Sequence, residues 1–175
     1  MQDDGGAIDA SGHDDNGQRY IVYKVDGNSI GNGGSCGNDV APYVGTPIIL
    51  QPVTANGYTF DGTATTILDN NGAGDEGIVE APSLVQSGST YILFFSSGCY
   101  TTGAYNVNYA TASSITGTYT RAASPLFATD TDGLTAPGGA DVNVDATHML
   151  FHANYGSGRA AYEAILTISG TTVTA

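Results

Sequence analysis

A repeat of three similar units constrains the fold of this chain more than any other feature of its sequence. Each unit contains a short apolar run with β character, and the runs are Arg19 to Tyr23, Thr90 to Phe94 and Thr147 to Phe151. Eleven residues before the second residue of each run stand Asp9, Glu80 and Pro137. Eight residues after those positions stand the turn formers Gly17, Gly88 and Asp145. Each unit therefore predicts a strand, a tight turn and a second strand, which together form a β-hairpin.

A further stretch of β character follows each hairpin, at Thr46 to Val53, Tyr105 to Ala112 and Ala160 to Ile168. With Asp9, Glu80 and Pro137 as equivalent positions, the units are 71 and then 57 residues apart. Repeats of about 40 to 70 residues with three or four short strands are typical of propeller blades. A β-sandwich also has short alternating strands, but the agreement of two offsets across three units favours the propeller. Blades are expected at approximately 5–70, 71–133 and 134–175.

The composition agrees with an all-β fold. Glycine occurs 25 times and tyrosine 11 times, and only 12% of the residues are charged, which favours short strands and turns over helices. No helical periodicity and no linker is visible, so a single β domain over 1–175 is expected. The net charge of −13 argues against nucleic acid as a partner, because four basic residues cannot neutralise a phosphate backbone. The charge fits either a solubilising acidic surface or a carboxylate-lined site for carbohydrate or calcium.

Segments outside the repeat bear on the cellular location. The sequence as written has no signal peptide and no apolar run near the roughly 20 residues of a membrane-spanning helix, so no membrane partner is expected. Patterned sequence follows Met1–Gly6 almost at once, so we expect an N-terminal part to be missing. Cys36 and Cys99 lie in glycine-rich turns, which suits a disulfide in an oxidising compartment, although their spacing does not decide whether they pair. The spacing of the two cysteines does not predict a zinc site.

Two acidic residues stand at the start of predicted inner strands. The first strand of a propeller blade lines the central channel, so the repeat brings Asp9 and Glu80 towards one mouth of that channel. Two converging carboxyl groups are the minimum that glycoside hydrolysis requires. Glu80 is the better candidate for the acid, because the segment Val79–Pro82 offers an apolar setting that would keep its carboxyl group protonated near neutral pH. Asp9 would orient Glu80; the alternative is that both are ordinary strand-end carboxylates.

The third unit supplies candidate substrate-binding residues. Gly138 and Gly139 carry no side chain at the strand start, which would let a sugar or an ion approach the backbone closely. A plain β-bulge explains the same glycines equally well. His152 alternates with apolar neighbours and is a candidate channel contact for a sugar or ion, while a structural role is the simpler interpretation of a lone strand histidine.

Several motifs together resemble a known family: Gly6–Ala10, Asp14–Tyr20, Val79–Leu84, and Tyr109–Ala112 with Thr116–Tyr119. In their order and spacing they resemble glycoside hydrolase family 43 over essentially the whole chain, with fungal secreted members the most similar in character. The resemblance implies a five-bladed propeller and an extracellular inverting enzyme that acts on arabinan, arabinoxylan or related plant polysaccharides. Arabinofuranosidase, xylosidase and endo-arabinanase activities are all compatible with it.

The resemblance also implies roles for individual residues. It makes Glu80 the general acid and Asp9 the aspartate that modulates the acid. The general base of the family is an aspartate in the first blade, whereas this chain is expected to begin at the third, so we expect little or no hydrolysis by the chain alone. Pro137–Gly139 resembles the pore motif of the last blade without the histidine often found there. No cofactor is required, and a calcium or other ion in the pore is a weaker expectation.

Three blades do not close a ring, which leaves sheet faces and edges exposed. A missing N-terminal fragment, or a homodimer that closes with six blades, is expected to cover them. The alternative function is therefore a non-catalytic fragment that binds carbohydrate or mediates oligomerisation.

Overall fold

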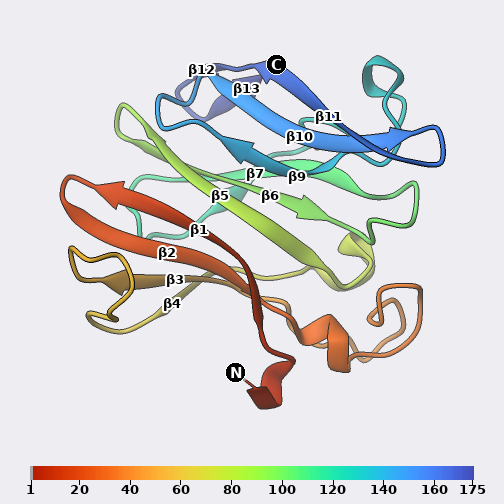
Figure 1. Cartoon of the computed structure of the whole chain (residues 1–175), viewed down its shortest axis with the longest axis horizontal. Helices are drawn as coiled ribbons and strands as arrows, with labels where there is room; N and C mark the ends of the chain where they lie inside the picture. Colours follow the sequence, from red (N-terminus) through yellow and green to blue (C-terminus); the bar gives the residue numbers. More distant parts are fainter. Residues whose placement is uncertain (1) are drawn as a thin grey trace.

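The computed structural model describes residues 2–175, and they form three antiparallel sheets that follow one another along the chain (Figure 1). The first sheet contains β1 (Ala7–Asp15), β2 (Gln18–Val25), β3 (Ile48–Val53) and β4 (Thr65–Leu68). The second contains β5 (Val79–Ser87), β6 (Thr90–Ser97), β7 (Asn106–Ala112) and β8 (Thr120–Arg121). The third contains β9 (Gly138–Val142), β10 (His148–Tyr155) and β11 (Gly158–Ile165). The prediction of an all-β fold is confirmed.

Short elements complete the chain. The strands β12 (Thr167–Ser169) and β13 (Thr172–Thr174) form a small hairpin at its C-terminal end. Four single-turn 3₁₀ helices lie in the connections: η1 (Gln2–Asp4), η2 (Gly27–Ile30), η3 (Gly72–Asp75) and η4 (Thr131–Gly133). Within residues 2–175, none of these helical segments has the length or the apolar character needed to cross a membrane.

The three sheets are arranged as propeller blades. Each of the first two sheets runs in strand order from its first strand to its fourth, and the first strands of neighbouring sheets lie together, β1 against β5 and β5 against β9. Figure 1 shows the sheets stacked face to face in chain order, with the N-terminus beside the first sheet and the C-terminus beside the third. Innermost strands that meet around a shared axis are the defining feature of a propeller. The three predicted hairpins are β1–β2, β5–β6 and β9–β10.

The hydrophobic core fills the spaces between the blades, and β6 explains how. Its side chains alternate, so Leu93 and Phe95 pack towards the first blade while Ile92 and Phe94 pack towards the third. A strand buried on both faces needs a continuous apolar run, which is what Tyr91–Phe95 provides. In β10 only one face is covered, because Met149 and Phe151 are buried whereas Leu150 between them is 60% exposed. The face of the third blade that points away from the second is therefore open.

A bulge at the same place in each innermost strand corrects the predicted register. Pairing shifts by one residue between Ile8 and Ser11, between Glu80 and Ser83, and between Gly138 and Asp141. The bulged residues Asp9, Ala81 and Gly139 all have positive φ, at 56°, 50° and 62°. Asp9 therefore corresponds to Ala81 and Gly139, and Glu80 corresponds to Gly138. The predicted equivalence of Asp9, Glu80 and Pro137 is wrong: relative to Asp9, Glu80 is one residue and Pro137 two residues before the equivalent position.

The turn chemistry explains this slip. The β1–β2 turn is Asn16-Gly17 with positive φ at both residues, whereas the β5–β6 turn is Gly88-Ser89 with positive φ at the first. In type I′ turns glycine prefers the second position, and in type II′ turns it occupies the first. Gly88 is the first residue of its turn and therefore corresponds to Asn16, not to Gly17. Because the sequence repeat was aligned on Gly17 and Gly88, the second unit was placed one residue out of register with the first.

A disulfide joins the first two blades. Cys36, in the connection between η2 and β3, bonds to Cys99, which follows β6, with 5.6 Å between their Cα atoms. The structure thus decides in favour of the candidate pairing that the sequence left open.

Candidate active site

Side chains of β1 attach the first blade to the second, although β1 and β5 belong to separate sheets. The Oδ2 atom of Asp9 accepts a hydrogen bond from the Ala81 amide at 3.0 Å, and the Ser11 hydroxyl donates to the Pro82 carbonyl at 2.7 Å. His13 follows in the same way, with Nδ1 2.9 Å from the Leu84 carbonyl oxygen. Ser11 and His13 are alternate residues of a regular strand and therefore point to one side, while Asp9 reaches the same joint from the bulge. The three side chains form a row along the joint. The row holds Asp9 beside the residue that follows Glu80.

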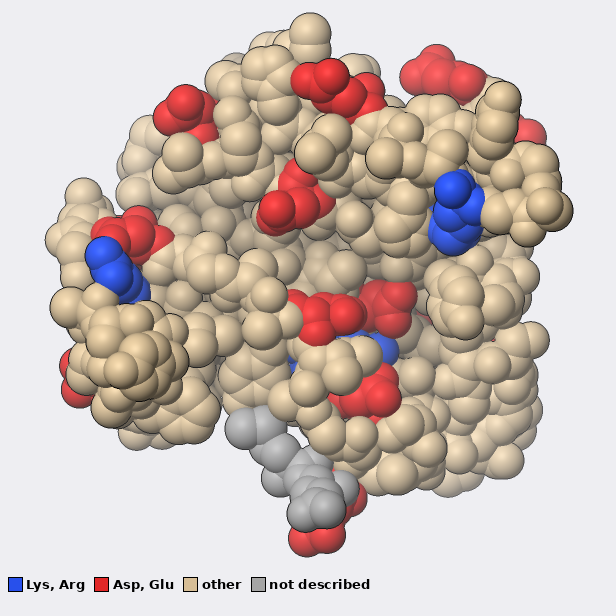
Figure 2. Space-filling view, in the orientation of Figure 1, with Lys and Arg blue, Asp and Glu red and all other residues tan. Residues whose placement is uncertain are grey.

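The innermost strands border an open hollow of about 500 Å³. It is lined by residues of β1, β5 and β9, among them Asp9, Ala81, Gly139 and Asp141. Figure 2 shows acidic groups gathered around the depression in the middle of this face of the molecule. Of the two predicted acidic residues, Asp9 lies in the lining of this concave surface, and Glu80 is the neighbour of the lining residue Ala81.

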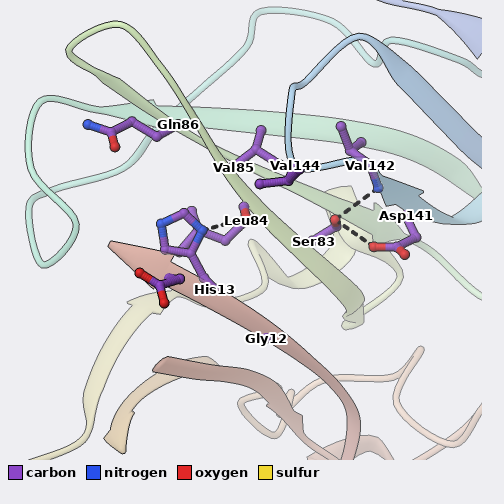
Figure 3. A pocket seen from close by; sticks show the side chains of 10 residues that line it. Gly12, His13, Ser83, Leu84, Val85, Gln86, Asp141, Val142 and Val144 are labelled. Atoms are coloured by element: carbon purple, nitrogen blue, oxygen red, sulfur yellow. Dashed lines mark hydrogen bonds between the residues drawn. The ribbon is translucent and has the colours of Figure 1, made fainter. Parts of the chain in front are cut away.

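A second hollow, of about 260 Å³, continues along the same strands past His13 (Figure 3). Here Ser83 links the second blade to the third, because its hydroxyl donates to Asp141 at 2.8 Å and accepts from the Val142 amide at 3.1 Å. Asp141 borders both hollows and is exposed. It is an acidic residue of the channel wall that the repeat did not identify.

Glu80 is held through both of its carboxylate oxygens. Oε2 lies 3.1 Å from the ammonium group of Lys24, and Oε1 accepts a hydrogen bond from the Tyr105 hydroxyl at 2.7 Å. The Glu80 side chain keeps 19% of its surface exposed, so its carboxyl group is partly accessible to solvent. The residue after it, Ala81, lines the open hollow. The predicted apolar setting is wrong, because the pleat and the neighbouring blade bring polar partners that do not adjoin Glu80 in sequence.

The sequence reasoning missed both partners of Glu80. Lys24 had a visible signal, since it is the only lysine of the chain and stands inside the apolar strand Tyr20–Val25. A charged residue at a buried strand position needs a partner, and it therefore marks a site. Tyr105 had no comparable signal among 11 tyrosines.

The two glycines of β9 make room for aromatic rings. A Cβ atom on Gly138 would overlap the ring of Tyr105, and one on Gly139 would overlap the imidazole of His152. The Tyr105 and His152 rings stack on each other with centroids 6.2 Å apart. Gly138 thus allows Tyr105 to reach Glu80, and the space that the missing side chains leave is filled by protein groups.

Burial sets the protonation of these rings. Burial and then the charge of Glu80 raise the pKa of Tyr105 well above its usual range, so its hydroxyl keeps its proton and donates to Glu80. Burial, followed by the Arg159 charge, lowers the pKa of His152, and its Nδ1 accepts a hydrogen bond from Arg159 Nε. Arg159 also donates to the Ala136 carbonyl at 2.6 Å and lies over the Tyr105 ring. Gly138, Gly139 and His152 therefore all border the group that holds Glu80.

Gly138→Ala is expected to destabilise the fold and to release Glu80 from Tyr105, because the added methyl group would displace the ring. Overpacking of this kind costs about 1–3 kcal/mol, measurable as a fall in the free energy of unfolding in urea. Gly12→Ala is the matched control, since Gly12 lies in β1 and a Cβ there meets nothing within 4 Å. Equal effects of the two substitutions would contradict the packing role of Gly138.

Metal ligands do not converge in this part of the molecule. Within residues 2–175, no three His, Cys, Asp or Glu side chains are placed to hold a metal ion together. No chemical step proposed below uses a metal ion.

Known proteins share both the sequence pattern and the fold. A thermostable family-43 glycoside hydrolase has 19% identity and a TM-score of 0.78 over 97% of this chain and 57% of that chain. An endo-1,4-β-xylanase from Bacteroides thetaiotaomicron has 22% identity and a TM-score of 0.75 over 96% of this chain and 57% of that chain. An α-L-arabinofuranosidase from Lactobacillus brevis has 14% identity and a TM-score of 0.73 over 97% of this chain and 55% of that chain.

The chain thus spans a little more than half the length of these solved structures, as part of the same propeller. No curated protein matches its sequence. The family model described as glycosyl hydrolases family 43 matches residues 1–165. The chain therefore belongs to glycosyl hydrolases family 43.

Proposed function

We propose that this chain is the acid-bearing part of a glycoside hydrolase that acts on plant cell-wall polysaccharide, with Glu80 as the general acid. The observation that carries the proposal is the placement of Glu80, which is fixed through both oxygens by Lys24 and Tyr105 and stays partly exposed, next to Ala81 in the lining of the open hollow. An acid of this kind must be held still and reach the leaving oxygen of the substrate. Family membership supports the reaction class.

In the proposed reaction Glu80 gives its proton to the glycosidic oxygen while the bond from that oxygen to the anomeric carbon breaks. A water molecule attacks the opposite face, and a second carboxylate takes its proton, which requires the two carboxyl groups to stand about 6.5–9.5 Å apart. We assign that base to a residue outside this chain, as the family resemblance implies. Asp9 fixes the backbone beside Glu80 through the Ala81 amide and adds negative charge near the acid.

The substrate class follows from the relatives. Solved structures of similar fold are named as an endo-1,4-β-xylanase and an α-L-arabinofuranosidase, which supports arabinoxylan or arabinan as the substrate. Gly138, Gly139 and His152 are proposed to border the sugar-binding side of the hollow. The disulfide supports an oxidising, extracellular location. The open face of the third blade, with Leu150 exposed, is proposed to be covered by a further N-terminal fragment or by a second copy.

The chain alone is expected to release little or no reducing sugar from arabinan or arabinoxylan, because an acid without a base on the opposite face does not complete inverting hydrolysis. The in-frame coding sequence upstream of Met1, expressed together with this chain, is expected to restore release. Reducing-sugar assays on both forms, with circular dichroism as a control for folding, measure this difference.

Two outcomes would contradict parts of the proposal. A folded longer form that releases no sugar from either polysaccharide would argue against the hydrolase. Oligosaccharide binding without release by that form would instead support the alternative function, a non-catalytic carbohydrate-binding fragment. Full activity of the chain alone would show that its own residues include the base.

A further inference from the structure

Lys24 lies beneath the proposed acid and joins two carboxylates. Its side chain is 1% exposed, and its ammonium nitrogen is 3.1 Å from Glu80 Oε2 and 3.1 Å from Asp26 Oδ1. Lys24 stands near the end of β2, opposite Ile8 on one side and Ile48 on the other. The two carboxylates keep about a fifth of their surface exposed, at 19% for Glu80 and 20% for Asp26. The ammonium group is therefore buried, and the two carboxylates lie between it and the solvent.

A buried ammonium group is costly unless hydrogen-bond acceptors surround it. It carries three N–H donors, of which one is donated to Glu80 Oε2, and the Asp26 carboxylate lies 3.1 Å away as an ion-pair partner. With both acids ionised the cluster of three groups has a charge of −1, and one added proton makes it neutral. A proton can thus join and leave Glu80 while the cluster stays close to neutral. Both states of the acid are needed within one catalytic cycle.

We propose that Lys24 is a positioning residue for Glu80. Its ammonium group holds Oε2 in place while Tyr105 holds Oε1, and it stabilises the carboxylate that forms when the proton passes to the leaving oxygen. Asp26 competes for the same ammonium group and so limits how strongly Lys24 favours ionised Glu80. The inference rests on the proposed role of Glu80 as the acid.

Other charged and titratable groups near Glu80 come from four further segments. Asp9 of β1 reaches it through the Ala81 amide, and Tyr105, which precedes β7, donates to Oε1. His152 of β10 and Arg159 of β11 contact the Tyr105 ring. None of these groups is changed when Lys24 or Asp26 is replaced, so the effect of the cluster can be separated from theirs.

The test follows the Glu80 carboxyl group directly and needs no hydrolysis. The chain has three glutamates, so carboxyl-¹³C-glutamate labelling gives three signals, and their assignment uses the loss of one signal in Glu80→Gln. Lys24→Met is expected to move the midpoint of the Glu80 titration up by about 1–3 pH units, because the opposite charge is lost. Asp26→Asn is expected to move it down, because Lys24 then serves Glu80 alone.

The control is Arg19→Met, which removes a positive charge from the same strand, where Arg19 pairs with Asp14 on the surface. It is expected to leave the Glu80 midpoint in place. An unchanged midpoint in Lys24→Met, or the same change in the control, would overturn the proposal, since a purely structural lysine would alter stability alone. If Lys24→Met does not fold, the proposal is tested by Asp26→Asn alone. A Glu80 midpoint that is unchanged or raised in Asp26→Asn overturns the proposal.

These results are independent of the reaction class. A midpoint that responds to Lys24 and Asp26 supports the positioning role even when no sugar is released. If sugar release depends on Glu80 but the Glu80 titration midpoint is unchanged in Lys24→Met, the proposed function stands and the positioning role of Lys24 is rejected.

Discussion

Glu80→Gln is expected to lower the rate of sugar release by about 10²–10⁴-fold, the usual contribution of a positioned general acid. The measurement uses whichever form of the protein, the chain alone or the chain with its upstream sequence, releases sugar from arabinan or arabinoxylan. Glutamine has the size of glutamate and still offers one oxygen to Lys24 or Tyr105, so the site stays formed. It has no proton to give to the leaving oxygen. Binding of oligosaccharide, measured by calorimetry, is expected to persist.

The leaving group provides a sharper test of the acid. An aryl glycoside whose phenol is a strong acid needs little protonation to depart, whereas a sugar hydroxyl needs much. The loss caused by Glu80→Gln is therefore expected to be much smaller on the activated aryl glycoside than on the polysaccharide. Equal losses on both substrates would contradict the acid role and indicate a structural one.

Glu163→Gln is the matched control for this substitution. Glu163 is one of the three glutamates, lies on β11 and has 63% of its side chain exposed. Its replacement makes the same chemical change away from the hollow. The expected rate is that of the unchanged protein.

Loss of the disulfide is expected to have the largest effect on stability. The double substitution Cys36→Ser and Cys99→Ser should lower the free energy of unfolding by about 2–5 kcal/mol. The bridge closes a span of 63 residues and connects two blades, so without it the unfolded chain gains conformational freedom. Urea unfolding at constant pH, followed by tyrosine fluorescence, gives the difference.

The reduced form of the unchanged protein is the control. It is expected to unfold at the same urea concentration as the serine variant, because both lack the bridge. A serine variant as stable as the oxidised protein would show that the bridge adds nothing to the packing between blades. The Cys99 amide also bonds to Glu76 Oε2 at 2.9 Å, so the loop is expected to keep its local form after reduction.

The repeat predicted more of the fold than any single motif did. Hairpins and blades are local in sequence, because turn residues and apolar alternation specify them. The register between blades was less certain, since glycine takes different positions in different turn types. A bulge that places Asp9 at positive φ leaves no clear sequence signal, because aspartate there replaces the glycine that this conformation favours.

The site was predicted only in part for a different reason. Asp9 and Glu80 could be predicted as candidates because the start of the first strand of a blade faces the channel, and this rule applies to each blade separately. The partners of Glu80 come from β2 and from the loop before β7, and no local pattern places those segments together. Contacts between strands distant in sequence depend on packing, so Lys24 and Tyr105 needed the structure.

The row of side chains along β1 has a consequence for how this sequence can change over time. Asp9, Ser11 and His13 all bond to main-chain atoms of the second blade. Every residue offers the same carbonyl group, so substitutions among the recipients leave the Ser11 and His13 bonds available. For these bonds the sequence requirement is one-sided, because the Ser11 and His13 side chains use carbonyl groups that any residue of the second blade supplies. The contacts of Tyr91 with Asp15 and of Glu80 with Lys24 place a requirement on side chains of the second blade as well.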